Sequence, residues 1–102
     1  MTVVVTGRHL DVTEAMKTYA EQKANKLTRY YDRIQEIEIV FDGGGKDQTV
    51  ACEMIVNAEH KRMFIANHNI GDAYACVDGC VDKLERQLSD HKKKLRNRKH
   101  PG

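Results

Sequence analysis

Residues 35–59 read QEIEIVFDGGGKDQTVACEMIVNAE, and this stretch decides the fold class. Its first part alternates with a period of two, which is typical of a strand with one buried face. The side expected to be buried comprises Ile37, Ile39 and Phe41. Three successive glycines then favour a chain reversal within residues 42–47, because glycine weakens regular elements and permits positive φ. Residues 49–59 alternate again, with Val50, Cys52, Met54, Val56 and Ala58 on one face. The stretch therefore predicts two strands joined by a hairpin turn.

The segments on either side predict two helices and two further strands. Residues 2–6 form a short β-branched run, and residues 63–66 an apolar run that follows a polar connection at 59–62. Thr13 is a good N-cap for a helix over residues 13–31, whose apolar face comprises Met16, Ala20, Leu27 and Tyr31. Asp72 is an N-cap candidate for a second helix. Its apolar positions recur at spacings of three and four from Tyr74 to Leu95.

The resulting order, β-α-β-β-β-α, predicts an α+β fold. We expect a four-stranded mixed sheet with two helices packed on one face, since the first two strands are joined by a crossover helix that permits a parallel pair. With 102 residues and no linker or repeat, a single domain over residues 1–96 is expected. Residues 97–102 form a short basic C-terminal extension.

Composition narrows the class of protein. Apolar residues make up 40% and charged residues 31% of the chain, which is typical of a soluble globular domain. No apolar run is long enough to span a bilayer, and the N-terminus lacks the features of a signal peptide. Three cysteines without framework spacing suit a reducing compartment. We therefore expect a cytoplasmic protein without a membrane role.

The net charge of +2 conceals a strong asymmetry along the chain. Residues 83–102 contain eight Lys or Arg and two acids, whereas residues 1–82 contain nine Lys or Arg and thirteen acids. A strongly basic end on a mildly acidic body is typical of nucleic-acid binding, although basic tails also serve solubility or bind anionic membranes.

Basic residues recur at helical spacing on both predicted helices. On the first, Tyr19, Lys23, Lys26, Tyr30 and Arg33 follow one another at intervals of three and four. On the second, Lys83, Arg86, Lys93 and Lys94 lie away from the apolar positions. If both helices cover one face of the sheet, these residues predict a cationic track that suits a phosphate backbone. The alternative is a solvated helix face with charge pairs one turn apart.

No other constellation indicates catalysis. Cys76 and Cys80 lie one turn apart but lack the four-ligand pattern of a zinc site, so we expect small buried apolar side chains. The histidines show no paired spacing, and nucleophile elbows, phosphate loops and dinucleotide motifs are absent from the sequence. We expect no enzyme activity, no metal and no cofactor.

Five blocks of the sequence resemble a known family. They are GRHLDVTEA at 7–15, KANKL at 23–27, YYDRI at 30–34, DAYACVD at 72–78 and DKLERQL at 82–88. In this order and over nearly the whole chain, they are similar to the ribosome hibernation promoting factors and to the ribosome-associated translation inhibitor called protein Y. That family has the β-α-β-β-β-α fold already expected from the pattern.

The resemblance implies a non-catalytic inhibitor of idle ribosomes in stationary phase or stress. Such a protein binds 16S ribosomal RNA of the small subunit, in the channel for messenger RNA and the anticodon ends of transfer RNAs. The family's RNA-contacting positions fall on Lys23, Lys26, Arg33, Lys83, Arg86 and Lys94, with Lys92 and Lys93 where the spacing drifts.

The chain as given ends soon after the second helix, without the dimerisation domain of long hibernation factors or the extended tail of protein Y. We therefore expect the short form, a monomer off the ribosome, in which ribosome dimerisation depends on a separate modulation factor. Two alternatives remain open: a double-stranded RNA-binding module not tied to the ribosome, and a structural or protein-binding domain.

Overall fold

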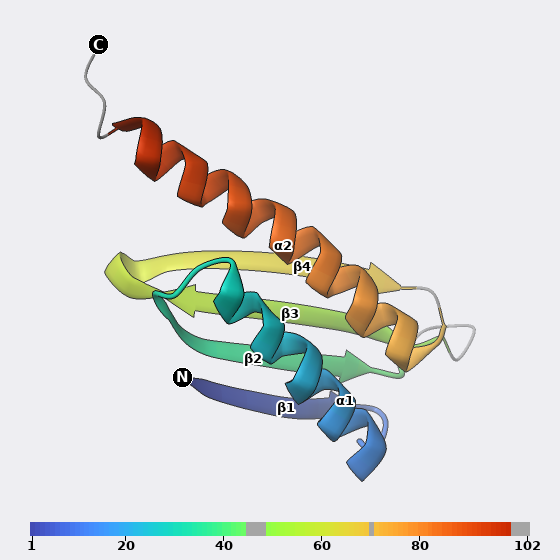
Figure 1. Ribbon diagram of the computed structural model, residues 1–102. Coiled ribbons are helices and arrows are strands. Elements are labelled where there is room, and N and C mark those ends of the chain that lie inside the picture. Colours follow the sequence, from blue (N-terminus) through green and yellow to red (C-terminus); the bar gives the residue numbers. More distant parts are fainter. Residues whose placement is uncertain (45–48, 70, 99–102) are drawn as a thin grey trace.

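The computed structural model describes residues 1–44, 49–69 and 71–98, with residues 96–98 as backbone only. Four strands form one sheet, and two helices lie across one of its faces (Figure 1). The strands are β1 (Thr2–Arg8), β2 (Ile34–Asp42), β3 (Ala51–Ala58) and β4 (Arg62–Asn69), and the helices are α1 (Glu14–Asn25) and α2 (Ala73–Arg98). Two 3₁₀ turns, η1 (Lys26–Arg29) and η2 (Glu59–Lys61), complete the fold. The predicted α+β class and element order are confirmed.

The strands lie in the order β1-β2-β3-β4. β1 pairs in parallel with β2, whereas the other neighbours are antiparallel. A parallel pair needs a crossover connection, and α1 supplies it. The antiparallel pairs need only short turns, and the turn from β2 to β3 lies between Asp42 and Ala51 as predicted. Residues 45–48 of that turn lie outside the described residues.

The core lies between the sheet and the helices. Ile37, Ile39 and Phe41 are fully buried, as their alternation predicted. α1 contributes Ala20 and Ala24, whose small side chains allow the helix to lie close to its neighbours. From β3 and α2 come Cys52, Met54, Val56, Cys76, Val77, Cys80, Leu84 and Leu88.

The orientation of β4 was left open by its sequence, and the structure decides it. Phe64 and Ala66 face the helices, while Met63 and Ile65 point to the opposite side of the sheet. Both faces of this edge strand carry apolar side chains, so alternation alone was uninformative.

The first helix is shorter than predicted. Thr13 caps it as expected, with its Oγ1 accepting a hydrogen bond from the Met16 amide at 3.1 Å. The α-helix ends at Asn25, however, and the chain tightens into η1. The Thr28 hydroxyl donates to the Asn25 carbonyl at 2.7 Å, a local hydrogen bond that competes with regular helix. Consequently Arg33 does not continue the helical spacing of Lys23 and Lys26.

The second helix is longer than the sheet it crosses. Its first turn is capped by Asp72, whose carboxylate accepts from the Tyr74 amide at 3.1 Å. At a rise of about 1.5 Å per residue, its 26 residues span about 39 Å, against about 27 Å for an eight-residue strand. Its C-terminal turns therefore project beyond the sheet (Figure 1). The helix continues to Arg98, past residue 96, while residues 99–102 of the predicted extension lie outside the described residues.

Candidate nucleic-acid interface

The seam between the two helices is a network of polar contacts. The Tyr19 hydroxyl donates to Asp78 Oδ1 at 2.7 Å, and Lys23 Nζ lies 3.8 Å from the same oxygen. The Tyr19 ring meets Tyr74 edge-on at 5.1 Å, and Lys23 lies over the Tyr19 ring at 5.4 Å. The hydrogen bond to Asp78, followed by burial, raises the pKa of Tyr19 to about 12. Tyr19 and Lys23 thus help to join the helices as well as lining their outer surface.

Acidic side chains accompany the basic ones along this seam. Lys23 and Lys26 line a shallow hollow together with Asp78, Asp82 and Glu85. The interaction between these opposite charges lowers the net positive potential there. The predicted cationic track is therefore interrupted by acids at the N-terminal half of α2.

The basic residues of α2 are divided between two sides of the helix. Lys83 donates from Nζ to the Asn67 carbonyl, which places it at the outer edge of β4. Lys94 lies eleven residues later, about three turns, and so on the same side as Lys83. Arg86 and Lys93 instead line a hollow near the end of the α1 segment, together with Tyr30, Ser89 and two acids, Glu85 and Asp90. Arg86 and Lys93 therefore lie on the side of α2 that faces the α1 segment. Lys83 and Lys94 lie on the side of α2 toward the β4 edge, away from α1.

Arg33 lies at a different place, next to the turn between β3 and β4. Its guanidinium Nη1 is 3.6 Å from Glu59 Oε2, and the Glu59 amide donates to the Arg33 carbonyl at 3.0 Å. Both side chains are about half exposed. Arg33 lies here because α1 ends at Asn25, so that Arg33 belongs to the connection between η1 and β2 and not to a helix.

The turn from β3 to β4 carries basic residues that the sequence reasoning did not select. His60 and Lys61 both have positive φ, 62° and 59°, and the Arg62 amide donates to the Glu59 carbonyl. Two successive residues of this kind form a type I′ turn, in which Asn-Gly is preferred. All three basic side chains from His60 to Arg62 are exposed. A run of three basic residues between two apolar strands was the available signal.

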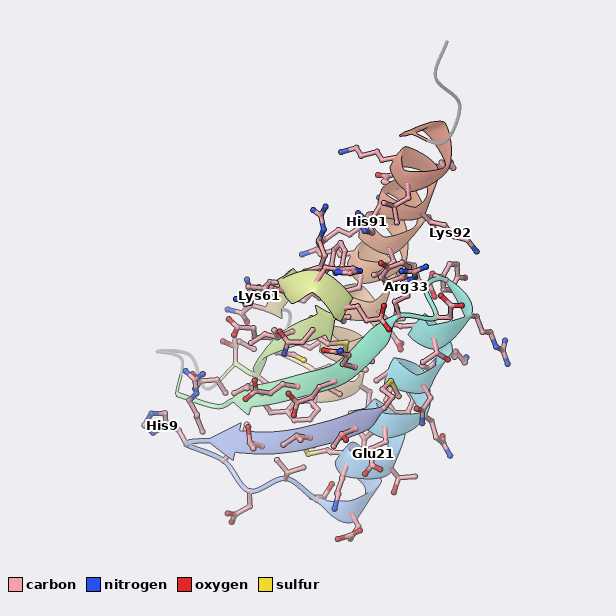
Figure 2. All side chains as sticks on the ribbon, turned by 90° about the vertical axis from the view of Figure 1, so that its left-hand side faces the viewer. His9, Glu21, Arg33, Lys61, His91 and Lys92 are labelled. Carbon is pink, nitrogen blue, oxygen red and sulfur yellow. The ribbon has the colours of Figure 1, made fainter. Side chains whose placement is uncertain are left out.

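These residues gather at one end of the molecule. Figure 2 shows Arg33, Lys61 and Lys92 at the end of the sheet from which α2 projects. We call Arg33, His60, Lys61, Arg62 and Lys92 the basic end. The His91 ring packs there edge-on against Tyr31 and Phe64, with centroids 5.3 Å apart in each case, and so supports the emerging helix.

The cysteines belong to the core, as expected. Cys52, Cys76 and Cys80 are free and buried. The Cys76 thiol donates to the Val50 carbonyl at 3.1 Å, and the Cys80 thiol to the Cys52 carbonyl at 3.4 Å. The hydrogen bond with Cys80, and then burial, raise the pKa of Cys52, which keeps this thiol protonated.

Within residues 1–44, 49–69 and 71–98, no group of three or more His, Cys, Asp or Glu is placed to hold a metal ion. Over the same part of the chain, no helix has both the length and the apolar character needed to cross a membrane.

Comparison with known proteins gives consistent matches. Residues 3–96 match the family model described as sigma 54 modulation protein / S30EA ribosomal protein. The chain is 35% identical to a ribosome hibernation promoting factor of Azotobacter vinelandii, over 92% of this chain and 85% of the relative. It is 34% identical to the ribosome hibernation promoting factor of Escherichia coli K12, over 94% of this chain and 98% of the relative.

Solved structures agree with these matches. A ribosomal subunit interface protein from Coxiella burnetii superimposes with a TM-score of 0.81 and 27% identity, over 91% of this chain and 99% of that one. The N-terminal domain of Thermus thermophilus protein Y gives a TM-score of 0.78 and 28% identity, over 89% and 99% of the two chains.

Proposed function

Since the chain belongs to the sigma 54 modulation protein / S30EA ribosomal protein family, we propose that it is a ribosome hibernation factor that binds the small ribosomal subunit. In this proposal it contacts 16S ribosomal RNA in the channel for messenger RNA and transfer RNA. There it inhibits translation by idle ribosomes through steric exclusion. The action is binding rather than catalysis, and it takes place in the cytoplasm, where ribosomes are.

The observation that carries the proposal is the distribution of basic side chains over the helices and the basic end. Arg86 and Lys93 lie beside Tyr30, and Arg33 and Lys61 lie at the end from which α2 projects. Lys and Arg neutralise phosphates and release counterions, which supplies most of the free energy of non-specific RNA binding. Tyrosine rings and guanidinium planes also stack on unpaired bases. The two surfaces are therefore suited to a folded RNA with both helical and unpaired parts.

The acids along the helix seam affect which basic residues we propose as RNA contacts. Lys23 Nζ lies 3.8 Å from Asp78 Oδ1, and this pairing competes with phosphate for the Lys23 ammonium group. We propose Lys26, Arg86 and Lys93, together with the basic end, as the principal RNA contacts. Lys83 and Lys94 would meet RNA only along the β4 edge.

Sedimentation through a sucrose gradient tests the proposal. The protein is expected to travel with small subunits at physiological salt and to dissociate as salt rises. If it neutralises five or more phosphates, the logarithm of its binding constant should fall against the logarithm of salt concentration with a slope of about −4 or steeper. A flat response to salt would contradict phosphate binding.

The same gradient tests the alternatives and the effect on ribosome dimers. Preferential binding to free RNA duplex over small subunits would favour a double-stranded RNA-binding module. Absence from every ribosomal fraction would favour a structural domain. Gradients run with and without a separate modulation factor measure whether a ribosome-dimer peak depends on that factor.

A further inference from the structure

Within residues 1–44, 49–69 and 71–98, both helices lie on one face of the sheet and no helix covers the opposite face, which we call the open face (Figures 1 and 2). The register places Val4, Glu38, Ile55 and Ile65 in one row across the four strands of this face. The next row ends in Met63, which pairs with Asn57. Met63 is 59% exposed and Ile65 is 44% exposed. Edge strand β4 therefore presents two large apolar side chains to solvent.

This open face carries more carboxylates than basic groups, whereas the helix side carries both. Glu36, Glu38, Asp42 and Glu53 point outward from β2 and β3, whereas Arg8 is the one outward Lys or Arg of the described strands. A surface with such an excess of carboxylates repels phosphate. If the helices and the basic end contact RNA, the open face is not part of the same RNA interface.

Two carbonyls on the outer edge of β4 already accept hydrogen bonds from α2. Gln87 Nε2 donates to the Ile65 carbonyl at 3.0 Å, and Lys83 Nζ donates to the Asn67 carbonyl. These contacts use the carbonyls to which an added strand would bind. A partner of this region therefore docks on the face of the sheet and not along its edge.

A hollow at one end of the open face carries no excess of acids. It has a volume of about 360 Å³, and its lining includes two acids, Asp42 and Glu53, and two cations, Arg8 and Lys83. The acidic excess lies instead toward Glu36 and Glu38, close to the apolar row. The open face thus combines exposed apolar groups and carboxylates within one patch.

We propose that the open face binds a lysine- and arginine-rich segment of a protein of the small subunit. Long basic side chains lay their aliphatic stems on apolar surface and keep their charged heads in polar surroundings. Met63 and Ile65 accept such stems, and Glu36 and Glu38 pair with the heads. This inference rests on the proposed ribosome binding and adds a protein partner to the RNA contact.

Charge reversal on the open face distinguishes a basic protein from RNA as the partner. Replacing a glutamate by lysine weakens binding to a basic protein and strengthens binding to RNA. Glu38→Lys is expected to weaken binding to purified small subunits by about tenfold, with a smaller loss for Glu38→Gln. Asp11→Lys makes the same change in net charge at an exposed loop position and is expected to bind as tightly as wild type or tighter. Binding of Glu38→Lys equal to or tighter than that of Asp11→Lys would overturn the proposal, provided that circular dichroism shows both variants folded.

A photo-crosslinking amino acid at position 63 identifies the partner on purified small subunits, with position 89 on α2, in the hollow of Arg86 and Lys93, as the matched control. We expect position 63 to crosslink to a Lys- and Arg-rich segment of a ribosomal protein and position 89 to crosslink to 16S RNA. Crosslinks from position 63 to RNA or to a second copy of this chain would overturn the inference, as would the absence of any crosslink. Failure of the wild-type chain to sediment with small subunits would instead remove the proposed function, and this inference with it.

Discussion

At the scale of single residues, the structure assigns two roles to basic and aromatic side chains that look alike in sequence. Tyr19 and Lys23 both meet Asp78 and hold the helices together, whereas Arg86 lies outside this network. Substitution of Tyr19 should therefore change the stability of the fold, while substitution of Arg86 should change binding. The two effects are separable because they are measured on the free protein and on the ribosome.

Tyr19→Phe removes the hydrogen bond to Asp78 while retaining the ring contact with Tyr74. We expect the free energy of unfolding in urea to fall by about 1 kcal/mol at pH 7. The pKa of Tyr19 in the fold, about 12, lies above its ordinary value of 10.0, so the protonated form is favoured by folding. This contribution is complete below about pH 10 and is lost as the pH rises toward 12. The difference between wild type and Tyr19→Phe should therefore shrink over that range, and a constant difference would contradict this account of the bond.

At the turn of His60 and Lys61, we expect one substitution, Lys61→Gly, to raise the stability of the fold and to weaken ribosome binding. A non-glycine residue in the left-handed region costs about 1 kcal/mol, so Lys61→Gly should stabilise the fold by roughly that amount. The same change removes a charge from the basic end and should weaken binding to small subunits by about threefold or more. Thermal unfolding and gradient sedimentation measure the two effects.

His60→Asn is the matched control for this turn, because asparagine tolerates positive φ and Lys61 stays in place. It should raise the melting temperature without weakening ribosome binding to the same extent. Equal binding by Lys61→Gly and wild type would remove Lys61 from the RNA surface.

At the scale of elements, the approach of α2 to β4 depends on Gly79. A Cβ atom at this position would lie 2.4 Å from the His68 ring, so α2 packs against β4 through a backbone surface. Glycine inside a helix normally costs about 1 kcal/mol relative to alanine. Its presence here is explained by close packing rather than by helix propensity.

Gly79→Ala is expected to destabilise the protein by about 1–3 kcal/mol, against the direction that helix propensity predicts. The overlap involves Cδ2, Cγ and Nε2 of the His68 ring, so the ring, β4 or α2 must shift to admit the added methyl group. In a His68→Ala background the same substitution should be neutral or stabilising, because the ring is absent. Urea unfolding of the four proteins in this cycle measures the coupling, and additive effects would show that His68 is not the cause.

At the scale of the whole molecule, the balance of charge differs between two surfaces, although the helices carry acids as well as bases. The helix side and the basic end carry exposed Lys and Arg, and the uncovered sheet face carries Glu36, Glu38 and Glu53. Such a distribution orients the protein on an anionic partner before contact is made. Orientation is therefore expected to depend on salt more strongly than folding does.

Reversing two positive charges on the helix side tests whether this surface binds the ribosome. Lys26→Glu with Arg86→Glu should abolish inhibition of translation in a cell-free assay and weaken small-subunit binding by at least about tenfold. Both side chains are exposed, so the circular dichroism spectrum should remain that of the folded protein. Retained inhibition by this double variant would exclude both positions from the functional surface.

Much of the fold was predictable because the relevant signals are local. Alternation in β2 and β3 identified their buried faces, and the oxygen-bearing side chains of Thr13 and Asp72 identified the starts of both helices. The end of α1 was not predictable in the same way, because residues after Asn25 keep a helical pattern while a 3₁₀ turn replaces the α-helix. The sequence predicted a set of basic residues for the candidate site, and their arrangement on the surface required the tertiary structure.

The sequence by itself determined the class of fold, the order of its elements and the family, since periodicity and short motifs depend on residues close together in the chain. Only the tertiary structure decided where each charge lies and which groups it meets. Lys23 meets Asp78 across the helix seam, Lys83 is drawn to the β4 edge, and Arg33 meets Glu59 beside the β3–β4 turn. The physical reason is that electrostatic pairing depends on distance in space, and these partners lie sixteen or more residues apart in the chain.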